Sequence, residues 1–516
     1  MTTPQAADTI GAVLAAQAGL GDKPFLVADQ DRLTYGEADR RSRRIAGGLM
    51  AAGVRRGDRI ALLFGNKPGG VVALLAAARL GAVAMPLSTM STEAELEDLL
   101  DGSDAQYLIS DAEYRGRDLA AVVSAATGAT PNIPVMTPRL PTLRRVWVGV
   151  EGLEAAGEGQ DGLVAAAEAH VTPADPMVIV HTSGSTSRPK GVIHTHGAIF
   201  GYIRAVLPLR RLGPEDRLFS NSPFFWIGGL VFSLLSTLVA GARLVCSSAK
   251  QPSETLDLIE AEQINLTNGF VGTIMNLVHD PSFAGRDLSF IRRGNLYPLL
   301  SPEMQPADPE LRHNLLGMTE TCSVCLIGDH ENDLPEKYRG SFGKPVPGFE
   351  MRVVDLETGQ DASEGELWVR GRPVMQGYYG RERHETFAPG GWYRTSDVFR
   401  IDDEGFFYFR GRADAMIKTA GANVSPREVE IVLTELAPGH QPIVFGAPDP
   451  ERGQIVVAVL VGVEPIDAAA LREAAAAKLS RYKVPRRFVV MPDPEVPKLS
   501  SGKVDMKRLA EAVRER

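Results

Sequence analysis

Short apolar runs alternate with helical patterns along the first part of this sequence. Residues 59–64 predict a strand, residues 70–80 a helix and residues 82–87 a second strand. Strands that alternate with helices in this way build parallel sheets with helices packed on their faces. The sequence therefore predicts an α/β fold.

The chain is too long for one hydrophobic core. It has 516 residues, of which 44% are hydrophobic, and a single core stops growing at roughly 250–300 residues, so at least two domains are expected. The segment Glu151–Ala174, rich in Ala, Gly and Glu, predicts a connector between sub-domains. The pattern changes again near residues 411–414, where we expect a hinge. This places an amino-terminal domain at 1–412 and a carboxy-terminal domain at 413–516, the latter with an Ala-rich helix at 467–479.

Charge and cysteine content exclude several classes of protein. The chain has 55 basic and 64 acidic residues and a formal net charge of −9, which disfavours a nucleic-acid binder. Three cysteines, Cys246, Cys322 and Cys325, are too few for a disulfide framework and indicate a reducing compartment. No secretory signal is evident. The apolar stretch 224–242 contains Gly, Ser and Thr and has no flanking basic cluster, so we expect a buried helix, no membrane span and a cytoplasmic protein.

A loop of small residues between two apolar strands has the composition of a phosphate-binding site. The strand Val178–Val180 is followed by a run of glycine and hydroxyl residues that ends at Lys190. Small residues let backbone N–H groups and hydroxyls converge on phosphate oxygens, and Lys190 adds a positive charge. The loop is not a Walker loop, because Pro189 has no N–H to donate and Gly191 stands where Ser or Thr would bind magnesium.

This loop resembles the phosphate-binding signature of the adenylate-forming superfamily of acyl-CoA synthetases, peptide-synthetase adenylation domains and luciferases. Further segments are similar to the superfamily's other motifs and occur in the same order, at residues 314–320, 393–397, 411–430 and 497–503. The resemblance covers residues 33–509. It implies a large amino-terminal domain of α/β sub-domains with a small β-barrel-like part, and a small mobile α+β carboxy-terminal domain.

The resemblance also implies roles for individual residues. Thr319 contacts the nucleotide phosphate, Glu320 holds magnesium, Asp397 accepts hydrogen bonds from both ribose hydroxyls, and Lys503 is the catalytic lysine, acting with Lys190. The full set implied for ATP binding is Thr182, Ser183, Gly184, Ser185, Thr186, Lys190, Gly317, Met318, Thr319, Asp397, Arg412 and Lys503. In the hinge segment, Asp414 is the pivot, and Gly421, with Lys418 nearby, borders the channel through which the thiol enters.

Several positions depart from the superfamily pattern. Leu316 stands where an aromatic residue stacks on adenine, and Ser187 and Ser396 replace glycines, which we expect to be tolerated because serine is small. The double-glycine element reads Gly294-Asn295-Leu296-Tyr297-Pro298, so Tyr297 is a candidate for the missing aromatic face.

The segment 222–229 resembles the gate of the acyl pocket, with Trp226 where many relatives have histidine. The acyl pocket is expected to be lined by Phe225, Trp226, Gly229, Tyr297 and Leu316; the alternative is that some of these aromatics are core residues.

Three further features are expected to be structural. Cys322 and Cys325 have CxxC spacing without a second pair and predict core or pocket-lining residues rather than a metal site. His194 and His196 alternate on one side of a predicted strand and lack a third ligand, which disfavours zinc. The acidic run Glu93–Asp101 predicts a solvated helix face.

The resemblance implies a carboxylic acid:CoA ligase that uses ATP, magnesium and coenzyme A on an apolar acid, whether fatty, cyclic or aromatic. It would form an acyl-adenylate and pyrophosphate first, then acyl-CoA and AMP. A ligase that loads a carrier protein and a degenerate nucleotide-binding homologue stay open as alternatives, and so does a homodimer. The few residues after Lys503 favour free CoA over a fused carrier.

Overall fold

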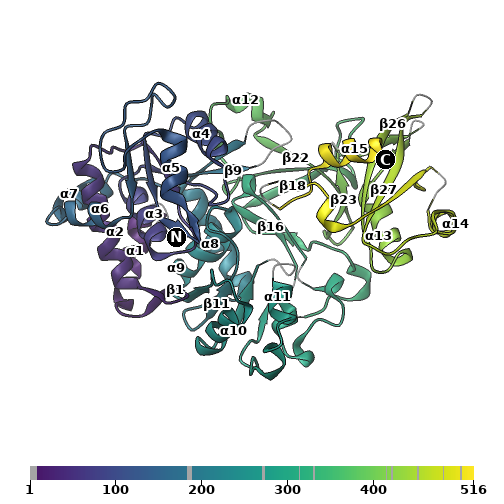
Figure 1. The fold of residues 1–516 in the computed structure, drawn as a ribbon, viewed down its shortest axis with the longest axis horizontal. Helices are drawn as coiled ribbons and strands as arrows, with labels where there is room; N and C mark the ends of the chain where they lie inside the picture. The colour runs from purple at the N-terminus through teal and green to yellow at the C-terminus, as the bar shows by residue number, and fades with distance from the viewer. Residues whose placement is uncertain are drawn as a thin grey trace. The chain divides into compact units, whose positions relative to one another are not determined.

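The computed structural model describes residues 8–182, 189–269, 274–312, 314–328, 332–413, 415–419, 422–449, 452–479, 482–499 and 502–516. The chain folds into two compact units (Figure 1). The first comprises Met1–Glu350 and Arg370–Tyr393, and the second comprises Met351–Val369 and Arg394–Arg516.

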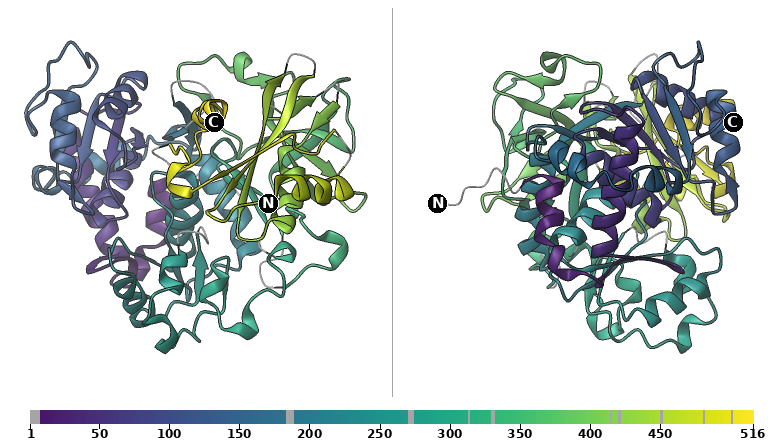
Figure 2. Two further views of the ribbon diagram at one scale, coloured as in Figure 1. Left: turned by 45° about the vertical axis from the view of Figure 1, so that its right-hand side comes forward. Right: turned by 90° about the vertical axis from the view of Figure 1, so that its left-hand side faces the viewer.

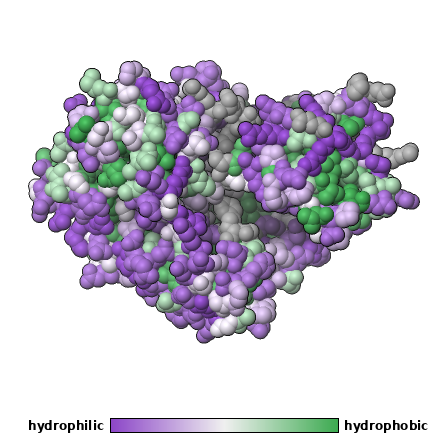
Figure 3. Space-filling model, viewed as in Figure 1, coloured by the Kyte–Doolittle hydropathy of each residue, from purple (hydrophilic) through white to green (hydrophobic). Residues whose placement is uncertain are grey.

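A seven-stranded sheet forms the first layer of the first unit. Its strand order is β20-β10-β9-β4-β3-β5-β8. The five consecutive strands β9, β4, β3, β5 and β8 run parallel to one another. The bounds are β3 Arg59–Leu63, β4 Val83–Pro86, β5 Tyr107–Ser110, β8 Arg145–Val148, β9 Pro176–Thr182, β10 Lys190–Thr195 and β20 Gly377–Tyr378. Helices α3 (Pro68–Arg79), α4 (Glu93–Gly102) and α5 (Leu119–Thr127) connect the parallel strands. The predicted α/β fold is confirmed. Polar residues cover much of the visible face of this unit (Figure 3).

A six-stranded sheet forms the second layer of this unit, in the order β14-β13-β11-β12-β1-β2. The bounds are β1 Pro24–Ala28, β2 Asp31–Thr34, β11 Arg217–Ser220, β12 Arg243–Cys246, β13 Leu266–Asn268 and β14 Arg293–Gly294. Its apolar side chains form a core with those of α10 (Pro252–Ala261) and α11 (Met275–Val278).

The predicted connector at 151–174 is partly wrong, because it contains two helices, α6 (Glu151–Ala156) and α7 (Asp161–Glu168). Both pack against α2 (Tyr35–Ala51), where Gly48 allows a close approach: a Cβ at Gly48 would lie 2.0 Å from the carbonyl oxygen of Leu153.

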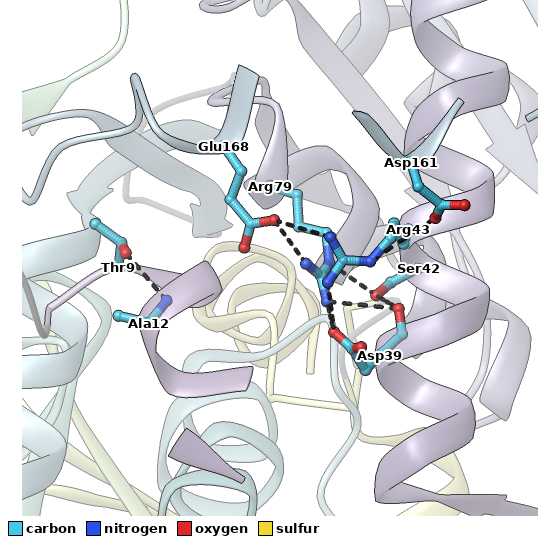
Figure 4. A network of polar contacts seen from close by, with 8 residues as sticks. All are labelled: Thr9, Ala12, Asp39, Ser42, Arg43, Arg79, Asp161 and Glu168. Atoms are coloured by element: carbon cyan, nitrogen blue, oxygen red, sulfur yellow. Dashed lines mark hydrogen bonds and ion pairs between the residues drawn. The ribbon is translucent and has the colours of Figure 1, made fainter. Parts of the chain in front are cut away.

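A buried arginine ties three helices of this region together (Figure 4). The side chain of Arg79 on α3 is 1% exposed. It donates to Ser42 Oγ (3.0 Å) and pairs with Asp39, both on α2, and it donates to Glu168 Oε2 on α7 (2.7 Å). Arg43 of α2 lies at the edge of the same network, 3.9 Å from Glu168.

The apolar stretch 224–242 is buried, as predicted. It forms the π-helix η2 (Gly228–Leu235) and the short helix α9 (Ser236–Ala240), next to α8 (His196–Arg210). Among the helices of the described residues, none combines the length and the apolar character needed to cross a membrane. The acidic run at 93–101 lies in α4, which buries Leu96, Leu99 and Leu100 and exposes most of its carboxylates, as expected for a solvated helix face.

The second unit contains a sheet in the order β25-β24-β27-β26, to which β28 adds in parallel beside β27. Helices α13 and α14 cover one face of β27 through Val456, Ala458 and Leu460, and α15 covers the other through Val457 and Val459 (Figure 2). The predicted Ala-rich helix and small α+β domain are confirmed. The bounds are β24 Ile417–Thr419, β25 Ala422–Val424, α13 Pro426–Leu436, β26 Gln441–Asp449, β27 Gly453–Val461, α14 Ala468–Lys478, β28 Arg487–Met491 and α15 Met506–Glu515.

The β-rich part of the chain forms two further sheets. One has the order β15-β16-β17, and the other has the order β18-β19-β22-β21 with β23 beside β22. The bounds are β15 Leu315–Met318, β16 Ser323–Ile327, β17 Lys344–Pro345, β18 Phe349–Val354, β19 Glu364–Gly371, β21 Phe387–Ala388, β22 Trp392–Ile401 and β23 Phe407–Arg412.

Candidate active site

The expected phosphate loop connects two paired strands. Thr182 ends β9 and Lys190 begins β10, and these two residues are paired across the antiparallel ladder. Both are half-buried. The ladder therefore fixes the two ends of the loop close together, as a phosphate-binding loop requires. Of the expected site residues, Ser183, Gly184, Ser185, Thr186, Asp414 and Gly421 lie outside the described residues, and Lys418 lies in β24.

A tight turn holds the expected Thr-Glu pair. Thr319 and Glu320 form the single-turn helix η8 (Thr319–Thr321) between β15 and β16. Gly317 and Met318 precede it in β15, and a Cβ at Gly317 would lie 2.8 Å from the carbonyl oxygen of Ser323. This close approach explains why the sequence has glycine there.

Cys322 and Ser323, which follow the Thr-Glu turn, adopt strained backbone angles. Cys322 has φ of 61° and Ser323 has φ of 134°, and such conformations cost non-glycine residues of order 1–3 kcal/mol each. The turn is held by the Thr321 hydroxyl, which donates to Ser323 O (2.8 Å), and by Tyr202 Oη, which accepts from Val324 N–H (3.0 Å). Strain that the surrounding contacts maintain is typical of functional turns.

Glu320 and Lys190 both contact one tyrosine. Tyr378 Oη donates to Glu320 Oε1 (2.8 Å), and Lys190 Nζ lies 5.3 Å from the centroid of the Tyr378 ring. Burial, with the nearby Glu320 charge, raises the pKa of Tyr378. Lys190 and Glu320 therefore contact the same side chain, that of Tyr378. The sequence did not indicate this residue. The Gly-Tyr dipeptide that forms β20 gave no such signal, because it is common in turns and strands.

A buried histidine holds the backbone of the same turn. His194 on β10 is fully buried, and its Nε2 lies 2.7 Å from the carbonyl oxygen of Thr319. Because a carbonyl can only accept, Nε2 carries the proton. Burial lowers the pKa of His194 to about 4, so the ring is neutral near pH 7.

His196 differs from the expectation that it shares a strand face with His194. It is the first residue of α8, and its Nδ1 accepts from Ile10 N–H (3.3 Å). The predicted strand ends one residue earlier because Thr195 caps α8, accepting from Ala198 N–H (3.1 Å). Within the described ranges, no three His, Cys, Asp or Glu residues gather into a metal site.

The donor chemistry of Glu320 fits a magnesium ion. Mg²⁺ is usually held by one or two carboxylates together with substrate phosphates and water, and does not need an all-protein cage. Glu320 is half-buried, and one of its two oxygens is bound by Tyr378. A single partly accessible carboxylate beside a phosphate-type loop therefore suits this ion.

Asn66 fixes the segment expected at the acyl gate. Its amide donates to Ser222 O (2.9 Å) and accepts from Phe224 N–H (2.8 Å), across more than 150 positions of sequence. Phe225 is buried, Trp226 is half-buried, and their rings meet edge to face at 5.7 Å. Nothing near Asn66 in the sequence pointed to this contact.

The remaining expected acyl residues are packed into their surroundings. Gly229 lies against the preceding turn, where a Cβ would be 2.0 Å from Pro223 O. Tyr297 is half-buried and packs against the core around α10 and α11, and Leu316 is half-buried in β15. Cys322 and Cys325 are fully buried thiols, in line with the expectation of core or pocket-lining positions.

In the second unit, Asp397 and Arg412 are direct cross-strand partners on β22 and β23. Arg412 donates to Asp397 Oδ1 (3.2 Å), and Asp397 N–H donates to Thr395 Oγ1 (3.0 Å). Ser396 has φ of 60°, a value that favours glycine, and its N–H donates to Glu366 Oε1 (3.0 Å). Glu366 was not anticipated from the sequence.

Lys503 lies in a short turn of the second unit. Lys498 and Val504 form an isolated bridge, and Leu499 N–H donates to Lys503 O (2.7 Å). Gly502 has φ of 79°, a value that favours glycine. Lys503 itself is exposed, so this turn carries a cation at the surface of the unit.

Comparisons with known proteins match both parts of the chain. A family model described as AMP-binding enzyme matches residues 14–379, and one described as AMP-binding enzyme C-terminal domain matches residues 428–503. Indoleacetate–CoA ligase of Aromatoleum aromaticum is 29% identical over 92% of this chain and 91% of its own length. The 3-hydroxybenzoate–CoA ligase of an Aromatoleum species is 30% identical over 99% of this chain and 97% of its own. The crystal structure of ATP-bound MatB from Rhodopseudomonas palustris superposes with a TM-score of 0.81, at 25% identity, covering 98% of this chain and 99% of that one.

Proposed function

The chain belongs to the AMP-binding enzyme family and is an ATP-dependent acid:CoA ligase, and we propose that its substrate is an aromatic carboxylic acid. The observation that carries this proposal is the match, over nearly the whole chain, to ligases named for aromatic acids. The reaction has two steps: the acid and ATP give an acyl-adenylate and pyrophosphate, and the acyl-adenylate and CoA then give the thioester and AMP.

The chemistry explains why the first step needs charged groups. A carboxylate is a poor acyl donor, because its leaving group would be oxide. Attack of a carboxylate oxygen on the α-phosphorus of ATP forms the acyl–phosphate bond and breaks the bond to pyrophosphate, which leaves. Two anions must therefore approach each other, and positioned cations lower the barrier by stabilising the charge in the transition state.

We assign the phosphate-binding side to the first unit. Lys190 is proposed to bind the triphosphate together with Thr182 and the loop that follows it, and Thr319 to contact the nucleotide phosphate. Glu320 would hold magnesium, which when bound neutralises phosphate charge. The support for this assignment is the arrangement of Lys190 and Glu320 about Tyr378.

We assign the ribose and the moving lysine to the second unit. Asp397 is proposed to accept from the ribose hydroxyls, with Arg412 beside it, since a carboxylate suits a diol. Residues 413–516 are proposed to move as one domain about Asp414. That motion would bring Lys503 to the first step, and the segment with Lys418 and Gly421 to the thiol in the second step.

The gate region supports an aromatic rather than a strongly polar acid. Phe225 and Trp226 meet edge to face in a segment that Asn66 holds in place, and aromatic rings pack well against one another in this geometry. We further propose a cytoplasmic location on the basis that all three cysteines are buried thiols.

Pyrophosphate release from ATP tests the substrate class. Purified protein is supplied with MgCl₂ and one acid at a time, from aromatic, cyclic and fatty series, with and without CoA. The proposal predicts release that CoA stimulates and that is greatest with an aromatic acid. Release confined to fatty acids would overturn the substrate class. Acyl-adenylate that accumulates until a carrier protein is added would replace CoA as the acceptor.

A further inference from the structure

One short segment of the first unit contacts both the phosphate-loop strand and the Thr-Glu turn. Tyr378 pairs with Val192 of β10, and the flanking backbone bonds fix the register, since Gln376 N–H donates to Ile193 O (2.9 Å) and Tyr379 N–H to Gly191 O (2.7 Å). Three residues before Tyr378, Met375 N–H donates to the carbonyl oxygen of Glu320 (2.8 Å). The segment 375–379 therefore sets the position of Glu320 relative to Lys190.

The hydroxyl of Tyr378 fixes which oxygen of Glu320 stays accessible. A carboxylate accepts, so the Tyr378 hydroxyl donates to Oε1 (2.8 Å), and Tyr393, whose hydroxyl lies 3.0 Å away, must donate to Tyr378 in turn. Among the described residues, no hydrogen bond or ion pair to Glu320 Oε2 is found. This oxygen is therefore left for a cation.

The ring of Tyr378 acts on Lys190. Tyr378 is paired with Val192 in the antiparallel ladder, so Lys190, two residues before Val192, is its diagonal neighbour on the same face. A long side chain can span this diagonal. The ammonium lies 5.3 Å from the ring centroid, within the range of a cation–π contact. Tyr378, a residue that is 7% exposed, thus contacts the two charged groups through its hydroxyl and its ring.

We propose that Tyr378 is a positioning residue that holds Glu320 with one carboxylate oxygen free for the nucleotide's magnesium ion and holds Lys190 over its ring for the triphosphate. The inference rests on the proposed function, and it adds a role that the sequence motifs did not assign. Because the two contacts use different atoms, they can be removed separately.

Two substitutions at Tyr378 separate the contacts, and the neighbouring tyrosine supplies a matched control. Y378F removes the hydroxyl and keeps the ring, whereas Y378L removes both. Y379F makes the same chemical change one residue away, where the hydroxyl donates to Asp104 (2.8 Å) rather than to Glu320. ATP affinity is measured by calorimetry for the full chain in excess EDTA and again in excess MgCl₂, so the readout does not depend on turnover.

The wild type and Y379F are expected to bind ATP more tightly with MgCl₂ than with EDTA. In Y378F, the gain in ATP affinity that MgCl₂ gives should be about ten-fold smaller than in the wild type, because a hydrogen bond to a charged group is lost. In EDTA, Y378F should bind ATP as well as the wild type. Y378L should also bind more weakly in EDTA, because Lys190 loses its ring contact.

The outcomes separate the inference from the function on which it rests. A Y378F protein whose magnesium-dependent gain equals that of Y379F overturns the positioning role, and so does a Y378F protein that unfolds at a much lower temperature than Y379F, which would mark a structural role. A wild type that neither binds ATP nor releases pyrophosphate with any acid overturns the proposed function itself.

Discussion

The imidazole of His194 donates a hydrogen bond from Nε2 to the carbonyl oxygen of Thr319 across 2.7 Å. This contact joins the strand after the phosphate loop to the turn that carries Glu320. His194 is fully buried, and its Nδ1 has no partner among the described residues.

Removal of this bond is expected to slow the first half-reaction. His194→Leu should lower kcat for pyrophosphate release about five-fold to ten-fold, in line with the roughly 1 kcal/mol of one neutral hydrogen bond. His194→Gln should recover part of the rate, because its amide can donate from a similar position. His196 is equally buried but bonds to Ile10, so His196→Gln is the control and should leave kcat nearly unchanged. Equal losses in the His194 and His196 variants would contradict the account.

Stability is expected to fall as the pH drops below about 6.5. Burial lowers the pKa of both His194 and His196 from 6.5 to about 4. Between these values the unfolded chain binds protons that the folded chain does not, so the free energy of unfolding decreases by about 1.4 kcal/mol per pH unit for each histidine. Below about pH 4 both states are protonated and these two groups add no further slope.

Urea denaturation at a series of pH values checks this slope. His196→Leu should reduce the slope of the unfolding free energy against pH by about 1.4 kcal/mol per pH unit, the contribution of one histidine. A free energy of unfolding that does not change across this range in the wild type, or a slope that the variant leaves intact, would show that the imidazoles do not titrate as their burial implies.

The part of the fold that the sequence predicted well is the part set by local patterns. Two apolar runs of strand length and the helical pattern between them predicted β3, α3 and β4 to within a residue or two. The prediction succeeded because all three elements are buried and therefore consist mostly of apolar residues. The connector at 151–174 was missed as structure, since α6 and α7 are short and stabilised by α2 rather than by their own sequence.

The candidate site was predictable only where a motif carries its chemistry in sequence. Lys190, Glu320 and Asp397 stand in recognisable runs, whereas Tyr378, Asn66 and Glu366 act through partners about 30 to 160 positions away. Their pairing follows from sheet order and strand register, which no local pattern specifies. For the same reason the strained angles at Cys322 and Ser323 could not be anticipated.

Asp397 is expected to determine how the enzyme recognises the ribose. The wild type should prefer ATP over 2′-deoxy-ATP, because the carboxylate loses one hydroxyl partner with the deoxy nucleotide. Asp397→Asn should raise KM for ATP about ten-fold and narrow the preference, since hydrogen bonds to a charged group contribute about 1.5–3 kcal/mol. KM values for both nucleotides measure this. An Asp397→Asn enzyme with the same preference as the wild type would place the ribose elsewhere.

Arg79 is expected to stabilise the first unit without affecting the chemistry. Arg79→Met would remove the buried partner of Asp39 and Glu168, and because these carboxylates are 30% and 17% exposed and keep Arg43, the expected loss is about 1–3 kcal/mol. Arg43→Met removes a neighbouring arginine whose side chain is 28% exposed, and should cost less than about 1 kcal/mol. Urea denaturation compares the two variants. A loss at Arg43 as large as that at Arg79 would contradict the assignment of the network's strength to the buried ion pairs.

The most direct test of the central claim is mass spectrometry of the products formed from an aromatic acid, ATP, MgCl₂ and CoA. 3-Hydroxybenzoate and indoleacetate are the first acids to use. The account predicts that AMP and the acid's CoA thioester appear in equal amounts, and that Lys503→Ala forms neither at an appreciable rate although the exposed lysine leaves folding unchanged. ADP in place of AMP, or a thioester formed equally well by Lys503→Ala, would contradict it.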